Sequence, residues 1–422
     1  MDVLFLCHRV PFPPSSGSKV RAFHVIRHLS AQGHRVTVAS LARSQEELEQ
    51  SEGLAGHCSV RILERIGRPA ALGRMIARLP TAHPSSFGYF HSPRLLRRVR
   101  HALATTPYDL VFVHSSSMAP YALGAPARAL RILDFCDMDS EKWREYARQK
   151  PFPLSAGFSL EGVKLGAEEA RLARQFDLST CATPAELRTL QSLAPDAASD
   201  WFPNGVDTAH FSPREGYDSD LIVFVGRMDY FPNQQAVTDF CRDVLPRLQR
   251  RRPGVRFEIV GADPPRSIRA LGQRPGVTVT GTVPDVRQHV TRAALTVAPL
   301  RIARGTQNKV LESMAMGVPV VLSPAVAQGV DAVPGQHFLC AATPEEWEAV
   351  ILRILDASAL RNELAREARE RVMSHHGWDA SMARLDGLIA RALEARAQTG
   401  KGATAAGAAA TAYGAASRVE AA

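Results

Sequence analysis

Residues 304–321 read RGTQNKVLESMAMGVPVV, and this stretch decides the fold class of the chain. A loop containing Gly305 leads into a helical run, Gly317 ends that run, and a buried apolar strand follows at once. A strand that directly follows a helix in this way is typical of βαβ units, whose strands pair in parallel. The stretch therefore predicts an α/β fold built on a mostly parallel sheet.

The same alternation of short apolar runs and helical stretches continues along the chain in two series. The first series predicts strands at residues 2–7, 35–40, 59–63, 109–114, 131–136 and 177–181, with helices at 20–31 and 161–176. The second begins after WFPNGVD (201–207) and predicts strands at 221–225, 257–260, 277–280, 295–300 and 318–323. It ends with helices at 358–375 and 378–396, which are separated by a break at His376 and Gly377.

Two such series predict two doubly wound, Rossmann-like domains. We expect residues 1–203 to form the first domain and 204–377 the second, with helix 378–396 joining the first. The Ala/Gly-rich residues 397–422 are expected to form a disordered tail. Ligands of such folds bind at the carboxyl ends of the strands, so the site should be assembled from loops of both domains in an interdomain cleft.

Composition excludes several classes of protein. The 422 residues are 45% hydrophobic and 22% charged, which is ordinary globular usage and excludes a largely disordered chain. The six cysteines form neither a CxxC pair nor a metal-ligand spacing, which excludes a disulfide framework and a zinc site. The N-terminus carries an acid where a signal peptide needs positive charge, and no apolar run is long enough to span a bilayer. We therefore expect a cytoplasmic protein that is neither exported nor integral to a membrane.

The net charge of +9 is concentrated in one segment. Residues 60–103 contain nine arginines and one acid, Glu64, and their apolar residues recur at helical spacing around 72–79 and 95–103. A basic amphipathic surface of this kind favours an anionic membrane surface as partner, and so a peripheral position on the inner face of the cytoplasmic membrane. The alternative is a solvated helix face that packs on its own domain. Nucleic acid is disfavoured because aromatic residues for base stacking are sparse.

The loop after the first strand reads HRVPFPPSSGSK (8–19) and lacks the GxGxxG of a dinucleotide-binding dehydrogenase, so a nicotinamide enzyme is disfavoured. Gly17, Lys19 and Arg21 instead place free backbone N–H groups and two cations at the start of a helix, where an anion would bind. The alternative is a surface loop that Ser18 caps.

In the second domain, Gly226 and Arg227 leave a predicted strand, where the glycine permits a tight turn and the arginine points into the cleft. The helix that follows Gly305 should aim its N-terminus at a phosphate. Arg227 and Lys309 together would then neutralise a diphosphate.

On the same helix, Glu312 lies one turn after Asn308 and would accept hydrogen bonds from both hydroxyls of a ribose. The alternative is a surface salt bridge between Lys309 and Glu312.

Three motifs in this order resemble the retaining glycosyltransferases of family 4, which have the GT-B fold of two Rossmann-like domains. The motifs are FVGR (224–227), LESMAMGVPVV (311–321) and the domain junction PNGVD (203–207), which Phe211 follows. The stretches HRVPFPP (8–14) and LDFCDMDSEKW (133–143) resemble the sugar transferases associated with PEP-CTERM/exosortase exopolysaccharide systems.

The resemblance implies roles for several residues. Arg227 and Lys309 would hold the donor diphosphate, Glu312 the ribose, and the loop that ends at Val283 the base, while His114 would contact the transferred sugar. As a lone residue, His114 is alternatively structural.

The chain departs from the family pattern at two places. Arg304 stands where the family's pair of glutamates begins, at a donor-binding position, and Asn233 lies near the position of a usual lysine.

Asp137-Met138-Asp139 is a DxD sequence, by which transferases of another fold hold a nucleotide diphosphate through a divalent cation. We favour the alternative that Asp139 or Ser140 caps the following helix, with Asp137 on the acceptor side, and expect no metal.

The predicted reaction moves a sugar from a nucleotide diphosphate donor to a glycan or polyprenyl-linked acceptor, with retention and without a further cofactor. A nucleotide-sugar 2-epimerase of the same fold and a non-catalytic nucleotide-sugar-binding protein remain as alternatives.

Overall fold

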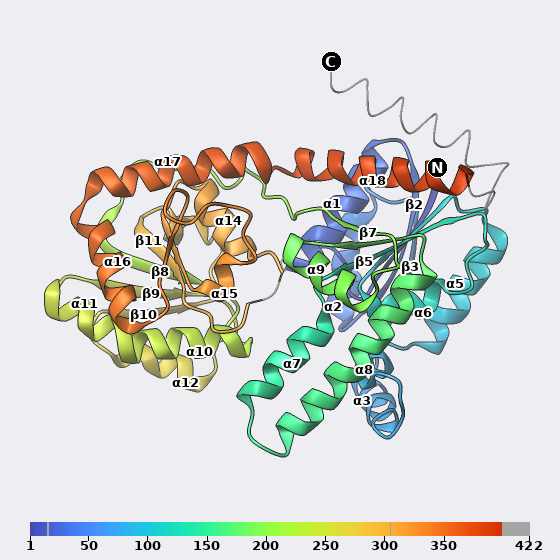
Figure 1. Ribbon diagram of the computed structural model, residues 1–422, viewed down its shortest axis with the longest axis horizontal. Coiled ribbons are helices and arrows are strands. Elements are labelled where there is room, and N and C mark those ends of the chain that lie inside the picture. The colour runs from blue at the N-terminus through green and yellow to red at the C-terminus, as the bar shows by residue number, and fades with distance from the viewer. Residues whose placement is uncertain (15–16, 304, 399–422) are drawn as a thin grey trace. The chain divides into compact units, whose positions relative to one another are not determined.

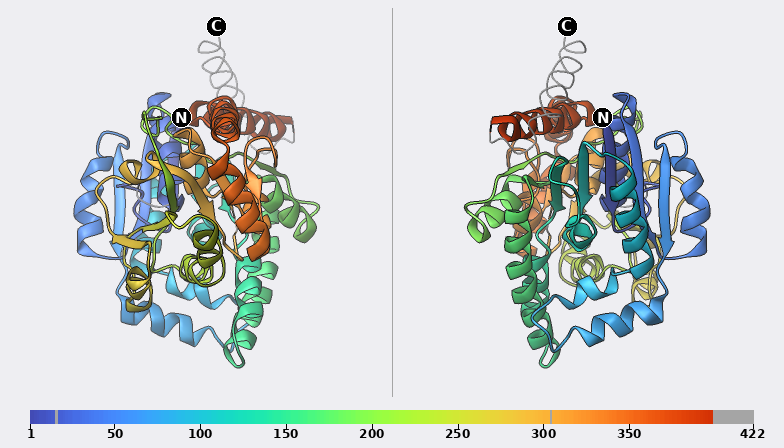
Figure 2. Two further views of the ribbon diagram at one scale, coloured as in Figure 1. Left: turned by 90° about the vertical axis from the view of Figure 1, so that its left-hand side faces the viewer. Right: turned by 90° about the vertical axis from the view of Figure 1, so that its right-hand side faces the viewer.

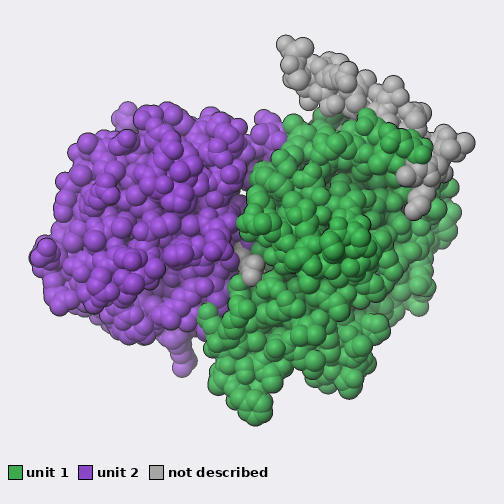
Figure 3. Space-filling model, viewed as in Figure 1, with its two compact units in different colours: residues 1–203, 382–422 green, residues 204–381 purple. Residues whose placement is uncertain are grey.

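The computed structural model describes residues 1–14, 17–303 and 305–398 (Figure 1). The chain forms two compact units (Figure 3). Unit 1 contains residues 1–203 and the chain from Met382 onward, and unit 2 contains residues 204–381. Each unit has its own parallel sheet, as expected for two Rossmann-like domains.

The sheet of unit 1 has seven parallel strands in the order β3-β2-β1-β4-β5-β6-β7. All five side chains of β4 are buried, because helices cover both faces of such a sheet. The strands are β1 (Asp2–Cys7), β2 (Arg35–Ala42), β3 (Val60–Arg65), β4 (Leu110–His114), β5 (Leu130–Cys136), β6 (Leu178–Cys181) and β7 (Ser199–Trp201).

Helices of unit 1 flank this sheet, and α7 and α8 pack together as a long hairpin (Figures 1 and 2). The helices are α1 (Gly17–Ala31), α2 (Gln45–Gln50), η1 (Ser51–Leu54), α3 (Arg68–Ala77), α4 (Ser85–Tyr89), α5 (Pro93–Thr105), η2 (Ser116–Met118), α6 (Ala119–Ala122), α7 (Asp139–Gln149), α8 (Leu154–Gln175) and α9 (Pro184–Leu193). Helix α18 (Trp378–Gln398) begins in unit 2 and continues into unit 1.

The sheet of unit 2 has six parallel strands in the order β10-β9-β8-β11-β12-β13. The strands are β8 (Asp218–Val225), β9 (Arg256–Val260), β10 (Val277–Gly281), β11 (Ala293–Ala298), β12 (Val320–Leu322) and β13 (Leu339–Cys340). The helices are α10 (Phe231–Asp239), the π-helical η3 (Phe240–Val244), α11 (Leu245–Arg251), α12 (Arg266–Arg269), η4 (Ala270–Gln273), α13 (Arg287–Val290), α14 (Asn308–Ala315), α15 (Pro324–Ala327), α16 (Pro344–Asp356) and α17 (Ser358–His375).

The predicted fold class is confirmed, and all eleven predicted strands are present. β11 ends at Ala298 instead of at residue 300 because Pro299 has no N–H to continue the ladder. The short edge strands β7 and β13 were not predicted, since two or three residues carry too little apolar pattern. The expected break is confirmed, because α17 ends at His375 and α18 begins at Trp378. Of the predicted tail, residues 399–422 lie outside the described residues.

The predicted N-terminal cap of α7 is wrong. Neither Asp139 nor Ser140 serves as the cap, and Met138 occupies that position. Two carboxylates from other helices accept the backbone N–H groups there: Glu186 accepts from Met138 at 2.7 Å, and Glu169 accepts from Ser140 at 3.1 Å. A cap supplied by residues distant in sequence leaves no local signal.

Two of the helices in the basic segment 60–103, α3 and α5, have opposite character. On α5, Leu95, Val99 and Leu103 are buried in the core, so this helix packs on its own domain and its arginines form the solvated face. The apolar face predicted at 95–103 is present, and it packs on the domain as in the alternative considered from the sequence. On α3, by contrast, Leu72 and Ile76 are exposed.

The segment that enters unit 2 lies against the break between α17 and α18. Val206 donates its backbone N–H to His376 O at 2.7 Å. A Cβ on Gly205 would lie 2.6 Å from the Trp378 side chain, so only glycine fits where the chain passes this ring. Within the described residues, no helix has both the length and the apolarity required to cross a membrane.

Candidate functional site

The carboxyl ends of both sheets carry backbone strain. Three described non-glycine residues have positive φ angles: Ser115 (83°), Cys136 (63°) and Asp263 (57°). Ser115 directly follows β4, Cys136 ends β5, and Asp263 follows β9. Such conformations persist where the surrounding structure imposes them, and they are enriched at ligand sites. Each of the three adjoins one of the polar clusters described next.

The first cluster lies in unit 2 and is centred on Lys309. This residue is the second of α14, and its Nζ lies 4.3 Å from the centre of the Phe224 ring. Nζ also donates to Asn233 Oδ1 at 3.0 Å, and Asn233 Nδ2 donates to Arg227 O at 2.8 Å. Asn233, which the sequence indicated only as a departure from the family pattern, thus connects Lys309 to the turn after β8.

Burial gives Lys309 and Glu312 unusual protonation behaviour. It lowers the pKa of Lys309 to about 7, although the Glu312 carboxylate opposes this shift. Burial likewise raises the pKa of Glu312 to about 7, again against the effect of its neighbour. Lys309 hydrogen-bonds to Asn233 in place of the simple surface salt bridge considered from the sequence. Two groups that titrate near neutrality in the first turns of a helix such as α14 are typical of a ligand site.

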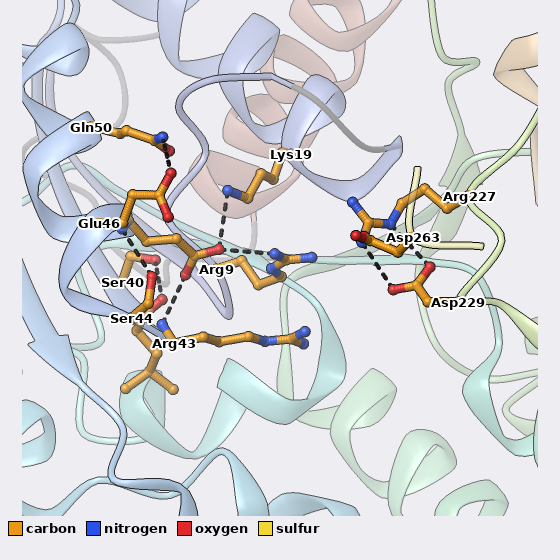
Figure 4. Close-up of polar contacts among 12 residues, drawn as sticks. Arg9, Lys19, Ser40, Arg43, Ser44, Glu46, Gln50, Arg227, Asp229 and Asp263 are labelled. Carbon is orange, nitrogen blue, oxygen red and sulfur yellow. Dashed lines mark hydrogen bonds and ion pairs between the residues drawn. The ribbon is translucent and has the colours of Figure 1, made fainter. Parts of the chain in front are cut away.

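Arg227 follows Gly226 at the end of β8 and is half exposed. Its guanidinium pairs with Asp229 at 2.9 Å and with Asp263 at 2.6 Å, as Figure 4 shows. These carboxylates orient the guanidinium but also compete with any anionic ligand. A Cβ on Gly226 would lie 2.7 Å from the Asn233 amide, so glycine permits the contact between the turn after β8 and helix α10.

The remaining predicted donor residues of unit 2 lie in loops after strands and at the start of α14. Gly305 has a φ of 64°, and Asn308 begins α14 and accepts from Asn204 Nδ2 at 3.3 Å. Val283 follows β10, and its partly buried side chain packs against the small apolar cluster beside the sheet. Arg304 lies outside the described residues.

The second cluster lies in unit 1 and is centred on Asp134. This buried carboxylate accepts from Arg21 Nε at 2.8 Å, from Arg21 Nη2 at 2.9 Å and from Thr180 at 3.0 Å, and it contacts His114 Nδ1 at 2.8 Å. Burial alone would raise the pKa of Asp134, but Arg21 and then His114 hold that pKa well below its usual value. An ionised Asp134 fixes His114 with its Nδ1–H directed at the carboxylate.

Asp134 was not predicted as a site residue, although strand register contains the signal. β4 and β5 pair in parallel with His114 opposite Asp134. A polar residue in each of two neighbouring buried strands, at the same level, indicates a side-chain contact.

The structure does not support Arg21 and Lys19 as anion ligands. Arg21 is completely buried, its guanidinium lies 3.5 Å from the centre of the Phe202 ring, and it also donates to Phe202 O. Lys19 is only 4% exposed and pairs with Glu47 at 3.1 Å. Both cations therefore serve internal ion pairs. Gly17 is the first residue of α1, as the predicted loop-to-helix transition requires.

Beside His114, a pocket of about 310 Å³ opens within unit 1. His8, Asp137 and Lys142 line it together with Trp143. Burial raises the pKa of Asp137 to about 7, and Glu186 adds to the rise. Within the part of the chain that the structure describes, Asp137 Oδ1 is a buried oxygen without a hydrogen-bond partner. The pocket thus contains a carboxyl group that can exchange a proton near neutral pH.

Family models match both halves of the chain. Residues 15–210 match the model described as Glycosyltransferase Family 4, and residues 219–357 match the one described as Glycosyl transferases group 1. With one such match in each Rossmann-like unit, the chain is a glycosyltransferase of the GT-B type.

Solved structures with the same fold are distant in sequence. Sucrose-phosphate synthase from Thermosynechococcus elongatus is 16% identical, with a TM-score of 0.71 over 94% of this chain and 100% of that one. HepE from Anabaena in complex with UDP and glucose is 15% identical, with a TM-score of 0.64 over 92% and 99%. WaaG, a glycosyltransferase involved in lipopolysaccharide biosynthesis, is 16% identical, with a TM-score of 0.62 over 91% and 98%. No protein of curated function is similar enough in sequence to count as a match.

Proposed function

We propose that this glycosyltransferase moves a sugar from a nucleoside diphosphate donor to a hydroxyl of a glycan or lipid-linked acceptor, with retention at the anomeric carbon. The observation that carries the proposal is the Lys309 cluster. A partly buried ammonium at the N-terminus of α14, with Glu312 one turn later, matches the charge and hydroxyl pattern of a ribose diphosphate. The UDP and UDP-glucose complexes of HepE, a structural neighbour, support a donor of this class.

In the proposed reaction, negative charge develops on the leaving diphosphate. Lys309, Arg227 and the N-terminal dipole of α14 stabilise that charge. Arg227 exchanges part of its pairing with Asp229 and Asp263 for the phosphate when the donor binds. The leaving phosphate then assists removal of the acceptor proton on the same face of the sugar, so the route requires no enzyme nucleophile.

On the acceptor side, we assign the pocket beside His114 to the transferred sugar and the incoming hydroxyl. Asp134 holds the His114 ring in one orientation, and Asp137 offers an oxygen acceptor within the same pocket. This arrangement positions a hydroxyl by hydrogen bonds instead of by a metal ion. Asp139, the other acid of the DxD sequence, lies 3.7 Å from Lys142. We therefore expect activity to persist in EDTA, whereas loss on chelation and rescue by Mn²⁺ or Mg²⁺ would contradict this assignment.

We place the reaction in exopolysaccharide biosynthesis, with the acceptor presented at the cytoplasmic membrane surface. The sequence resemblance to exosortase-associated sugar transferases supports this placement, and the involvement of WaaG in lipopolysaccharide biosynthesis is compatible with it.

The decisive experiment has two stages. Thermal-shift screening of the full chain with UDP-, GDP- and ADP-sugars identifies the donor, and product analysis with polyprenyl-linked acceptors follows. We expect release of the nucleoside diphosphate to depend on an acceptor. With retention, the new glycosidic bond of the product should have the same axial or equatorial orientation as the sugar–phosphate bond of the donor. Release of a free C2 epimer would identify an epimerase. Donor binding with no turnover on any acceptor would identify a binding protein.

A further inference from the structure

Seven large apolar side chains are exposed on one part of unit 1, and we call them the apolar docking face. Their exposed fractions range from 41% for Leu72 to 83% for Phe152. The members are Leu72, Ile76, Leu79, Phe152, Leu154, Leu160 and Val163. They belong to α3 and the residues after it, and to α8 and the loop before it. Isolated exposed apolar residues are normal, but a group of this size marks an interaction surface.

The two segments that carry the docking face are tied into one block. Lys164 of α8 donates from Nζ to Leu79 O at 2.7 Å. Arg74 of α3 donates to Gly88 O of α4 at 3.3 Å, and Glu161 of α8 accepts from Ser85 N at 2.9 Å. Figures 1 and 2 show α3 beside the α7–α8 hairpin, where both project beyond the sheet of unit 1. The exposed apolar residues therefore belong to one surface.

The solvent side of α8 has the wrong composition for an ordinary surface helix. Ala156, Leu160, Val163 and Ala167 are all exposed and recur at i, i+4, i+7 and i+11, so they form one stripe along the helix. A helix that only packs on its domain carries charged or polar residues on this side, as α5 does. Apolar residues here are explained if this side meets an apolar medium.

Two stretches that border the face, residues 65–83 and 147–160, carry charges of one sign only. Residues 65–83 contain Arg65, Arg68, Arg74 and Arg78, and residues 147–160 contain Arg148 and Lys150, without one Asp or Glu in either stretch. A projecting apolar surface with a basic border is complementary to a bilayer with anionic headgroups. It gives reversible binding, because the apolar side chains enter the interface while the bases contact lipid phosphates.

We propose that the apolar docking face inserts into the interfacial region of an anionic membrane and holds the enzyme there through α3 and the start of α8, without α5. This inference goes beyond the proposed function, because it concerns the surface on which the enzyme works and needs no nucleotide sugar for its test.

The first experiment measures flotation of the full chain with phosphatidylglycerol-containing vesicles. The face variant carries Ile76→Ser, Leu160→Ser and Val163→Ser. The control variant carries Val60→Ser, Val333→Ser and Met373→Ser, at residues of similar exposure elsewhere. We expect vesicle binding to fall about tenfold or more in the face variant and to stay unchanged in the control. Equal binding of wild type and face variant, or no binding of wild type, overturns the proposal.

A second pair of variants separates α3 and the hairpin from α5. A variant with Arg68→Gln and Arg148→Gln should bind anionic vesicles more weakly, and its binding should depend less on salt. A variant with Arg97→Gln and Arg100→Gln on α5 should bind as the wild type does. The opposite result overturns the assignment to α3 and α8. Sedimentation also overturns the proposal if the wild type is a dimer without lipid and the face variant is a monomer, because the face would then join two copies. A thermal shift of the face variant with the donor shows that the variant is folded and binds donor. This readout tests the proposed function independently of membrane binding.

Discussion

At the scale of single residues, Lys309 and Arg227 reach the same predicted phosphate from different environments. The Lys309 ammonium is held over the Phe224 ring, whereas the Arg227 guanidinium is half exposed and already pairs with two carboxylates. A charge in a less polar environment interacts more strongly with a ligand, because water screens it less. Lys309 should therefore contribute more to donor use than Arg227.

We expect Lys309→Ala to lower kcat/KM for the donor by about two decades and Arg227→Ala by about one, the range for a charge-assisted hydrogen bond of roughly 1.5 to 3 kcal/mol. Steady-state kinetics with varied donor measures both. Arg242→Ala is the control, because this arginine also pairs with two carboxylates of unit 2 but does not belong to the Lys309 cluster. Near-normal kinetics in both site variants would remove these residues from the donor site.

The pKa values of Lys309 and Glu312 predict a bell-shaped pH profile. Burial lowers the pKa of Lys309 to about 7 and raises that of Glu312 to about 7. Phosphate binding needs the ammonium, which is lost as pH rises through 7, and ribose binding needs the carboxylate, which is lost as pH falls through 7. The profile of kcat/KM for the donor should therefore peak near neutrality as a property of the coupled pair.

Two substitutions test the limbs of this profile separately. Glu312→Gln should remove the acid limb, because its amide does not titrate. Lys309→Arg should remove the alkaline limb, because a guanidinium stays charged throughout. A flat wild-type profile between pH 5 and 9, or unchanged limbs in the variants, would show that another pair controls donor use.

At the scale of elements, the paired strands β4 and β5 join His114 to Asp134 and Arg21. We expect Asp134→Asn to lower the free energy of unfolding by about 3 to 5 kcal/mol, because the completely buried Arg21 would lose its counter-charge. His114→Gln keeps the ion pair, so its thermal denaturation should resemble that of the wild type while transfer falls. Calorimetry and activity compare the two, and a wild-type melting temperature in Asp134→Asn would refute the structural role of the pair.

The elements also show what sequence pattern can and cannot predict. β4 was predicted because a short apolar run bounded by turns has a strong local signal, but the burial of Arg21 was not, since it depends on Asp134 and Phe202, distant in the chain. α8 begins at Leu154, seven residues before its predicted start, because the apolar residues of its first turns face solvent and break the expected periodicity. Local pattern thus predicted strands and motifs, while partners brought together by folding remained hidden.

At the scale of the whole molecule, the chain passes between the two units twice, at residues 203–204 and 381–382. Gly205 comes directly after the first passage and contacts Trp378, which lies three residues before the second passage. Two-domain transferases exclude water by moving one domain against the other, and such motion is absorbed at a few residues near domain boundaries. We infer that this glycine contact sets the path of the chain through the boundary.

Gly205→Ala should therefore affect transfer without affecting donor binding. The added Cβ lies 2.6 Å from the Trp378 side chain, so the ring or the chain must move, while the Lys309 cluster, supported within unit 2 by Asn233 and Phe224, stays intact. We expect an unchanged dissociation constant for the nucleoside diphosphate by calorimetry, a lower rate of transfer, and a larger share of donor lost to hydrolysis. Gly335→Ala, at a glycine with open space around it but a φ of 84°, controls for a generally strained backbone. Equal loss of transfer in both variants, or weaker nucleotide binding in Gly205→Ala, would show that the contact maintains the fold of unit 2 and does not control the boundary between the units.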